Sequence, residues 1–156
     1  ESLGGKFLTV EGAENLETEG GYAKEASDDF KNKQEELLSE TLKKIDIVIC
    51  TALIPGKKAP VIIKEGMINN MSSGSIIYDL AAIQGGNTAH TKVDEIVDIN
   101  GVKIMGESNI LNKLPTSASN LYAKNVFNFV SNLYDKENNK ININLEDEII
   151  EKTLIK

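Results

Sequence analysis

Three segments have the residue types of ligand-contacting loops, and each directly follows an apolar run of strand length. Their sequences are TALIPGK at 51–57, DLAAIQGGN at 79–87 and GESNILNKLP at 106–115. Ligands of an open parallel sheet bind beyond the carboxyl ends of its strands. If the preceding runs are parallel strands, binding chemistry is therefore expected at these three places.

Each segment also has a purely structural interpretation. The first offers the backbone groups of residues 51–53 and then turns at Pro-Gly, so a plain turn and a ligand loop both fit. The glycine pair at 85–86 permits positive φ and close approach of backbone to a ligand, with Asp79 at the strand end. Asn109 and Asn112 can hydrogen-bond a ligand or merely satisfy local backbone. The pattern alone favours the structural interpretation for the first and third segments.

Residues for covalent, acid-base or metal chemistry are sparse. Cys50, the single cysteine, lies in an apolar run, and His90, the single histidine, has no Cys or acidic partners at metal-ligand spacing. No Ser-His-Asp or Cys-His set can be assembled. The phosphate-binding patterns G-x-x-x-x-G-K-[ST] and G-x-G-x-x-G are both absent from the sequence. We therefore expect no catalytic residue and no metal site.

Charge and hydropathy argue against nucleic acid as a partner and against a membrane-spanning segment. The 156 residues include 17 Lys plus Arg and 24 Asp plus Glu, for a formal net charge of -7. An acidic chain is poorly suited to a phosphate backbone, so nucleic acid is not an expected partner. No run approaches the ~20 apolar residues of a membrane helix, so this chain is not expected to span a membrane.

Strands and helices that would position these segments alternate along the chain. Near-continuous apolar runs rich in β-branched residues predict strands at 6–10, 45–51, 75–80 and 102–105. Such runs are typical of parallel strands covered by helices on both faces. The sequence therefore predicts an α/β fold with a Rossmann-like parallel sheet and right-handed crossovers.

Helical spacing predicts three helices. They cover 27–44, with Ser27 as the N-cap, then 61–71 and 115–134. A short strand at 141–145 is expected in the tail. We expect one structural unit at 1–112 and a second, the long helix with its tail, at 113–156. The predicted buried face of the long helix consists of Tyr122, Val126, Phe129, Val130 and Leu133.

Four blocks of the sequence closely resemble the NAD(H)-binding domain I of proton-translocating nicotinamide nucleotide transhydrogenase. They occur in the order of the family and cover most of the chain. The blocks are GGYAKEAS at 20–27, DIVICTALIPGKKAP at 46–60, GSIIYDLAAIQGGN at 74–87 and GVKIMGESNILNKLPTSASNLYAKNVFNF at 101–129.

The resemblance accounts for the missing glycine motif. In the family, the G-x-G-x-x-G turn, the acidic residue for the adenosine ribose and an Arg-Gln-Asp loop all precede the matched region. The chain is therefore expected to be the carboxyl-terminal portion of domain I. Its Rossmann sheet would be partial, without the first βα unit, and would be followed by the long helix and a short terminal strand.

The resemblance also implies a set of cofactor contacts. The family's mobile loop falls on 20–27, with Gly21 and Tyr22 closing over the nucleotide. Gln34 and Leu53 match two further NAD-contact positions. Thr51 and Ala52 lie beside Leu53 in the same crevice. These six residues are the predicted NAD(H) site.

The reaction implied by the resemblance is direct hydride transfer between NAD(H) on this domain and NADP(H) on a partner domain. In the intact enzyme it would be coupled to proton movement through a membrane domain, and domain I is expected to form a homodimer. The domain would face the mitochondrial matrix, an organelle lumen or the bacterial cytoplasm. The nicotinamides carry this chemistry, so the absence of a catalytic cluster is consistent with it.

Two alternative functions are also compatible with the sequence. Alanine dehydrogenase resembles the same sequence, but its pattern has a catalytic Asp before Gln-Gly-Gly, where this chain has Ile83. An apolar side chain cannot transfer a proton, so the transhydrogenase is favoured. The chain could also act only as a folding or assembly module, because a sheet without its first unit leaves apolar surface exposed.

Overall fold

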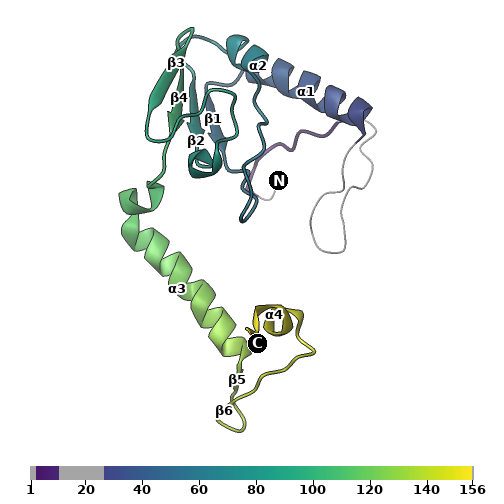
Figure 1. Cartoon of the computed structure of the whole chain (residues 1–156), viewed down its shortest axis with the longest axis vertical. Coiled ribbons are helices and arrows are strands. Elements are labelled where there is room, and N and C mark those ends of the chain that lie inside the picture. The colour runs from purple at the N-terminus through teal and green to yellow at the C-terminus, as the bar shows by residue number, and fades with distance from the viewer. Residues whose placement is uncertain (1–2, 11–26, 156) are drawn as a thin grey trace. The chain divides into compact units, whose positions relative to one another are not determined.

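The computed structural model describes residues 3–10 and 27–155. The chain divides into two compact units, residues 1–108 and residues 109–156, which are considered separately. Figure 1 shows that the first unit contains the sheet and helices α1 and α2, and that the second is built on the long helix α3.

The four strands of unit 1 form one sheet in the order β1-β2-β4-β3. Strands β1 (Ile47–Cys50), β2 (Ile76–Asp79) and β4 (Val102–Gly106) are parallel neighbours. Strand β3 (Ile96–Ile99) runs antiparallel to β4. The predicted parallel sheet of a Rossmann-like α/β fold is confirmed, with an antiparallel edge strand added.

The helices of unit 1 pack on this sheet. Helix α1 (Asp28–Leu42) begins after Ser27, whose hydroxyl accepts a hydrogen bond from the Phe30 N–H at 3.3 Å, as the sequence predicts. Helix α2 (Glu65–Asn69) and the 3₁₀ turn η1 (Ala82–Gln84) connect the strands. The core between them is Leu42, Cys50, Ile63, Met67, Ile68, Met71, Ile77, Val102 and Ile104.

The hairpin that adds β3 was not predicted from the sequence, although the sequence contains its signal. Asn100 and Gly101 separate β3 from β4, and their φ values are 54° and 85°. Two successive residues with positive φ make the tight turn that matches the twist of a hairpin, and Asn-Gly is its preferred sequence. The Asn-Gly pair between two apolar runs was therefore sufficient to predict it.

Two predicted elements of unit 1 were wrong in type or extent. Residues 6–10 form no strand: Phe7 and Leu8 are exposed, and no described strand pairs with them. β-Branched and aromatic residues fit a pleated surface only where a neighbouring strand supplies one. The helix predicted over 61–71 is limited to α2, because Ile63 instead forms a parallel bridge with Thr88.

The burial of the two faces of β1 also differs from the prediction. A strand covered on both faces would have no exposed apolar side chain, yet Ile47 and Ile49 are each 65% exposed. Val48 packs against the core from the other face, and Cys50 is buried. Only one face of β1 is therefore covered by the described residues.

Unit 2 has almost no interior. It comprises η2 (Ile110–Lys113), α3 (Pro115–Asn132), strands β5 (Tyr134–Asp135) and β6 (Lys140–Ile141), and α4 (Glu148–Thr153). Ile150 is its one buried hydrophobic residue among those described. The strand predicted at 141–145 is confined to β6, which pairs with β5 alone among the described strands.

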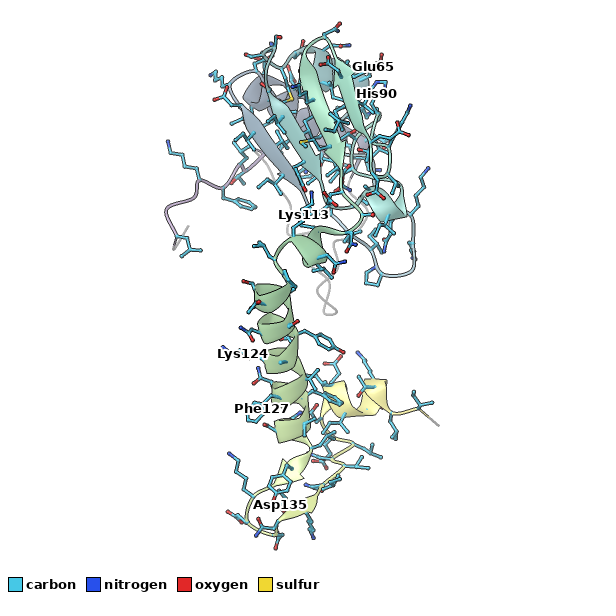
Figure 2. All side chains as sticks on the ribbon, turned by 90° about the vertical axis from the view of Figure 1, so that its left-hand side faces the viewer. Glu65, His90, Lys113, Lys124, Phe127 and Asp135 are labelled. Atoms are coloured by element: carbon cyan, nitrogen blue, oxygen red, sulfur yellow. The ribbon has the colours of Figure 1, made fainter. Side chains whose placement is uncertain are left out.

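The predicted buried face of α3 is wrong for the chain as described, because no residue of α3 is buried. Tyr122 is 72% exposed, and the other predicted members are at least partly exposed. Figure 2 shows the side chains of Lys124 and Phe127 standing out from this helix. The apolar spacing is present, but the described residues provide nothing to cover it.

Candidate functional site

The carboxyl ends of three parallel strands meet at one edge of the unit 1 sheet. In the sheet register, Cys50 pairs with Asp79 and Asp79 pairs with Gly106. The segments that follow these residues therefore begin side by side. This is the edge at which ligands of open α/β sheets bind.

Asp79 ends β2 and is fully buried, with 0% of its surface exposed. One carboxylate oxygen accepts from the Ala81 N–H at 2.9 Å. The other accepts from the Asn87 N–H at 2.6 Å and from the Thr91 hydroxyl at 2.5 Å. A buried carboxylate is costly unless donors surround it, so these three neutral donors stabilise it. Asp79 thereby fixes the loop that returns from β2.

Asn87 connects this loop to the end of β1 and is also fully buried. Its side-chain oxygen accepts from the Ala52 N–H at 3.0 Å, and its Nδ2 donates to the Ala52 carbonyl at 2.9 Å. The same nitrogen donates to the Pro60 carbonyl at 2.9 Å. The side-chain amide has two donor hydrogens and one acceptor oxygen, and all are engaged. The loop after β2 therefore holds the loop after β1.

Gln84 makes a second connection between the same two loops. With its amide nitrogen turned toward the first loop, it donates to the Lys57 carbonyl at 2.8 Å and to the Ile54 carbonyl at 3.0 Å. The Ala59 N–H donates to the Gln84 carbonyl at 2.8 Å. The Pro-Gly turn is thus held at both sides by one residue of the neighbouring loop.

The glycine pair serves this packing. Gly85 and Gly86 have φ values of 100° and 81°, a backbone conformation that favours glycine. A Cβ on Gly86 would lie 2.4 Å from the Thr91 Cβ and 2.8 Å from the Asp79 Oδ2. The close approach expected at these glycines is therefore made, at Gly86, to the protein's own side chains.

An apolar cavity of about 270 Å³ opens beside the end of β1. Cys50 borders it, and burial, with the nearby Asp79 charge, raises the pKa of this thiol to about 12. A thiol that stays protonated is a poor nucleophile, so Cys50 is suited to packing in the core rather than to catalysis. The cavity is lined by Leu38, Leu42, Val48, Ile49, Cys50, Thr51, Ala52, Ile62, Ile63 and Asn87.

Four of the six predicted contacts lie in the described residues. Thr51 and Ala52 line the cavity at the end of β1, and Leu53 follows with a half-exposed side chain. Gln34 is exposed on α1, one turn before the cavity residue Leu38. Gly21 and Tyr22 lie outside the described residues. The structure thus brings Thr51, Ala52 and Leu53 to one edge and leaves Gln34 on the helix beside it.

Other polar groups are poorer candidates. The Nε2 atom of His90 lies 3.9 Å from the Glu65 carboxylate and has no hydrogen-bond partner among the described residues; both residues are labelled in Figure 2. Over residues 3–10 and 27–155, no group of three His, Cys, Asp or Glu side chains could hold a metal ion. Asn109 and Asn112 fall at η2 and belong to unit 2.

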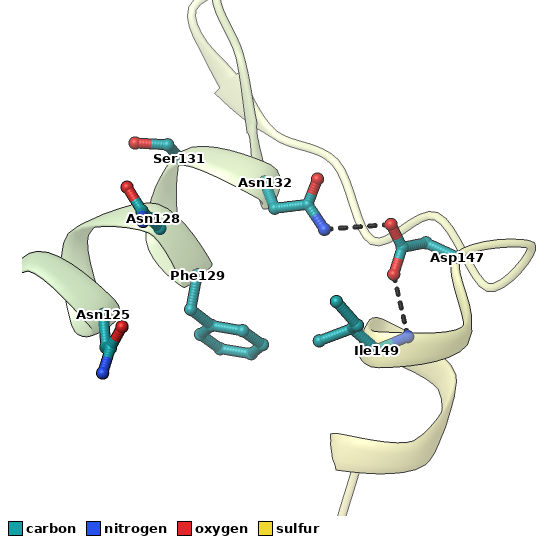
Figure 3. A pocket seen from close by; sticks show the side chains of 7 residues that line it. All are labelled: Asn125, Asn128, Phe129, Ser131, Asn132, Asp147 and Ile149. Carbon is teal, nitrogen blue, oxygen red and sulfur yellow. Dashed lines mark hydrogen bonds between the residues drawn. The ribbon is translucent and has the colours of Figure 1, made fainter. Parts of the chain in front are cut away.

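A groove of about 600 Å³ lies between α3 and α4 in unit 2, as Figure 3 shows. Asp147 caps α4 by accepting from the Ile149 N–H at 2.9 Å and the Ile150 N–H at 3.2 Å. The Asn132 amide donates to Asp147 at 3.0 Å. These hydrogen bonds hold the pKa of the Asp147 carboxyl below its usual value, the Asn132 bond most of all. The polar groups of the groove therefore join the two helices.

The architecture of unit 1 defines a class of protein. A mostly parallel sheet with helices and an organised carboxyl edge is the arrangement of a Rossmann-like domain of the dehydrogenase type. Over its full length, residues 1–156, the sequence matches the family described as "Alanine dehydrogenase/PNT, C-terminal domain". The chain belongs to this family.

Individual relatives agree with the resemblance found in the sequence. An NAD(P) transhydrogenase subunit alpha protein of Rhodospirillum rubrum is 46% identical over 99% of this chain and 41% of that protein. The Rickettsia prowazekii protein of the same name is 43% identical over 99% of this chain and 39% of its own length. Alanine dehydrogenase 1 of Staphylococcus aureus is 31% identical over 65% of this chain and 28% of that protein. The chain thus spans about two fifths of these transhydrogenase relatives.

A solved structure supports the same relationship. The crystal structure of transhydrogenase from Sinorhizobium meliloti matches 81% of this chain and 35% of that chain, with 36% identity and a TM-score of 0.63. The predicted resemblance to a transhydrogenase is confirmed, and alanine dehydrogenase is the more distant relative. No helix among the described residues is long and apolar enough to cross a membrane.

The sequence indicates the three loops but not the hydrogen bonds that join them. Asp79 is recognisable only as a residue at a strand end, and the roles of Asn87 and Thr91 are functional features that the sequence analysis missed. A carboxylate ending an apolar strand, followed eight residues later by an amide after two glycines, was the available signal. That signal becomes specific only when the register places the loops at one edge.

Proposed function

We propose that this chain is a segment of the NAD(H)-binding component of a proton-translocating NAD(P) transhydrogenase. The observation that carries the proposal is the 46% identity, over 99% of the chain, to a protein named as an NAD(P) transhydrogenase subunit alpha. The organised edge of the sheet supports it, because nucleotides bind at this position in Rossmann-like folds.

The residues at this edge fit a nucleotide. No described residue is hydrogen-bonded to the peptide N–H or C=O of Leu53, and these two groups are proposed to contact the nucleotide. The half-exposed Leu53 side chain supplies apolar contact area. Thr51 and Ala52 line the adjoining cavity, and Gln34 adds an amide on α1. Gly21 and Tyr22 are proposed to cover the nucleotide, as the resemblance implies.

The nicotinamide ring supplies the hydride chemistry when the cofactor is bound. The chain's own residues would bind the nucleotide, orient it toward the partner nucleotide and exclude water. No general acid, nucleophile or metal is required for these tasks. Cys50, buried and protonated, takes no part in them.

The remaining elements of the proposal concern the assembly. NAD(H) would bind on this domain and NADP(H) on a partner domain, with a membrane domain moving protons. Residues 1–112 would belong to the NAD-binding subdomain, and residues 113–156 would lead to the second subdomain. We further propose a homodimer tethered to the membrane enzyme, facing the bacterial cytoplasm, the mitochondrial matrix or an organelle lumen. The exposed apolar residues of α3 support a further protein surface in contact with this chain.

Alanine dehydrogenase activity is the less favoured candidate. By the resemblance, Ile83 occupies the position of its catalytic Asp, and its apolar side chain is 67% exposed in η1. A chain of this family without that carboxylate lacks the proton acceptor that amino-acid oxidation needs.

Calorimetry with NADH tests the proposal on this chain and on a form extended by the residues encoded before Glu1. We expect the extended form to bind NADH and the chain alone to bind weakly or undetectably, because the chain lacks the Gly-rich phosphate turn. Leu53→Glu in the extended form should weaken binding about tenfold or more by placing a carboxylate in the crevice proposed for the negatively charged dinucleotide.

Leu145→Glu is the matched control, since Leu145 is a similarly exposed leucine in unit 2. It should leave the dissociation constant within about twofold of wild type. An extended form that does not bind NADH contradicts the function. If the extended form binds but Leu53→Glu has no effect, the function stands and the site residues are wrong.

A further inference from the structure

We infer that Asn87 is a positioning residue for the nucleotide: its side-chain amide holds the Ala52 peptide groups so that those of Thr51 and Leu53 face the crevice. The inference rests on the proposed function. Asn87 itself is fully buried behind the end of β1, so it acts through Ala52 without touching the ligand.

The direction in which residues 50–53 present their backbone groups follows from two sets of hydrogen bonds. The Cys50 carbonyl accepts from the Leu80 N–H at 3.0 Å, on the side of β2. Two residues later, both peptide groups of Ala52 are bonded to the Asn87 side chain. Backbone groups of an extended chain alternate between its two sides. Because residues 50 and 52 face β2 and its loop, residues 51 and 53 face the opposite side.

The side chain of Asn87 does here what a neighbouring strand does inside the sheet. Its oxygen accepts from one N–H and its nitrogen donates to the carbonyl of the same residue, as a peptide pair would in a ladder. The alternation of β1 is thereby extended by one step beyond Cys50, where the strand ends. Few other side chains can do this, because Asp lacks the donor and Ser lacks the reach.

Asn87 is itself held from three directions. Its N–H donates to the buried Asp79 carboxylate at 2.6 Å. Its carbonyl accepts from the Ile62 and Ile63 N–H groups, both at 2.9 Å. Its Nδ2 also donates to Pro60. With backbone and side chain both fixed, the amide holds Ala52 in one position, which reduces the ordering cost when a nucleotide binds.

The test uses the extended form of the chain, with NADH as the probe. Asn87→Ser withdraws the amide from Ala52 without burying a new charge. We expect the dissociation constant for NADH to rise about tenfold, measured at a temperature where circular dichroism finds the variant fully folded. The amide hydrogen of Ala52 should exchange faster in the variant than in wild type.

Ser75→Ala is the matched control. Ser75 is a buried polar residue at the amino end of β2, where its hydroxyl donates to the Ile45 carbonyl at 3.4 Å. This change should lower the melting temperature but leave the NADH dissociation constant within about twofold, because the carboxyl edge is intact. If folded Asn87→Ser also binds NADH within about twofold of wild type, the positioning role is wrong.

A second measurement needs no variant and covers the case in which Asn87→Ser does not fold. In the wild-type extended form, NADH should slow amide exchange at Thr51 and Leu53, while Ala52 is already protected without ligand. Unchanged exchange at Thr51 and Leu53 on saturation with NADH would overturn the inference. Failure of wild type to bind NADH at all would instead overturn the proposed function, and this inference with it.

Discussion

Helices α1 and α3 carry similar apolar patterns but differ in what those patterns bury. In unit 1, α1 places Leu42 in the core, with Leu38 packed against it. In unit 2, α3 is longer, 18 residues against 15, yet buries none. Helical spacing therefore defines which side of a helix is apolar, but a tertiary partner decides whether that side is covered.

Two aspartates extend the contrast between the units. Asp79 in unit 1 and Asp147 in unit 2 each accept three hydrogen bonds. Asp79 is fully buried and fixes the loop after β2 at the candidate site, whereas Asp147 is a partly exposed helix cap. The same number of donors serves a positioning network in one unit and a local cap in the other.

The sharpest test of the contrast is a pair of identical truncations. Leu42→Ala, at 6% exposure, should lower the free energy of unfolding of unit 1 by about 2–4 kcal/mol. Leu121→Ala on α3, at 67% exposure, should change that of unit 2 by less than about 0.5 kcal/mol. Native-state hydrogen exchange of amides in each unit measures both. Equal losses would mean that α3 is packed in the isolated chain and that the contrast is wrong.

The two aspartates provide the next largest effect. Asp79→Asn replaces one acceptor oxygen by a donor within the buried network, so unit 1 should lose about 1–3 kcal/mol. Asp147→Asn should have a much smaller effect, because Asn is as good an N-cap as Asp. Urea unfolding of the two variants compares them directly. If Asp147→Asn lowers the free energy of unfolding more than Asp79→Asn does, the hydrogen bonds of Asp147 contribute more to stability than those of Asp79, and the contrast is wrong.

The pH dependence of folding provides a further contrast between the two units. In unit 1, the Cys50 pKa rises from its ordinary 9.0 to about 12 on folding, so the protonated thiol is favoured in the fold. Its stabilising contribution is complete below pH 9.0 and is lost as the pH rises toward 12. The free energy of unfolding measured over this range should fall less steeply for Cys50→Ala than for wild type.

Unit 2 should depend on pH in the opposite direction. The folded pKa of Asp147 is lowered from its ordinary 3.8, so the ionised cap is favoured in the fold. Its contribution is present above pH 3.8 and is lost as the pH falls through the folded pKa. Acid titration of the circular dichroism signal, with Asp147→Asn as the control, measures it. Identical acid profiles would contradict the role of Asp147 as an ionised cap.

The sequence was most informative where local chemistry decides the structure. Ser27 before two aspartates predicts the start of α1, and three β-branched runs predict β1, β2 and β4. These features depend on capping and on backbone preference, which are local. The Asn-Gly turn before β4 was equally local, so missing β3 was an avoidable error.

Contacts between distant segments of the chain could not be predicted from local sequence. The partners of Asn87 are 35 and 27 residues away, at Ala52 and Pro60. Neither partner has a side chain that signals the contact, because both offer only backbone groups. The prediction of a buried face on α3 is wrong for a related reason, because the spacing of apolar residues does not say whether another surface covers them. The six predicted nucleotide contacts come from resemblance and remain a prediction.

The position of β1 at the end of the sheet has a practical consequence. β1 pairs only with β2 among the described residues, and its Ile47 and Ile49 side chains are exposed. Its sequence IVIC has high β-propensity and no charge or proline. An edge strand of this kind is a template for strand addition between molecules, the first step toward cross-β aggregates. Concentrated solutions of the isolated chain are therefore expected to aggregate through β1, and Ile49→Lys would introduce a gatekeeper charge against it.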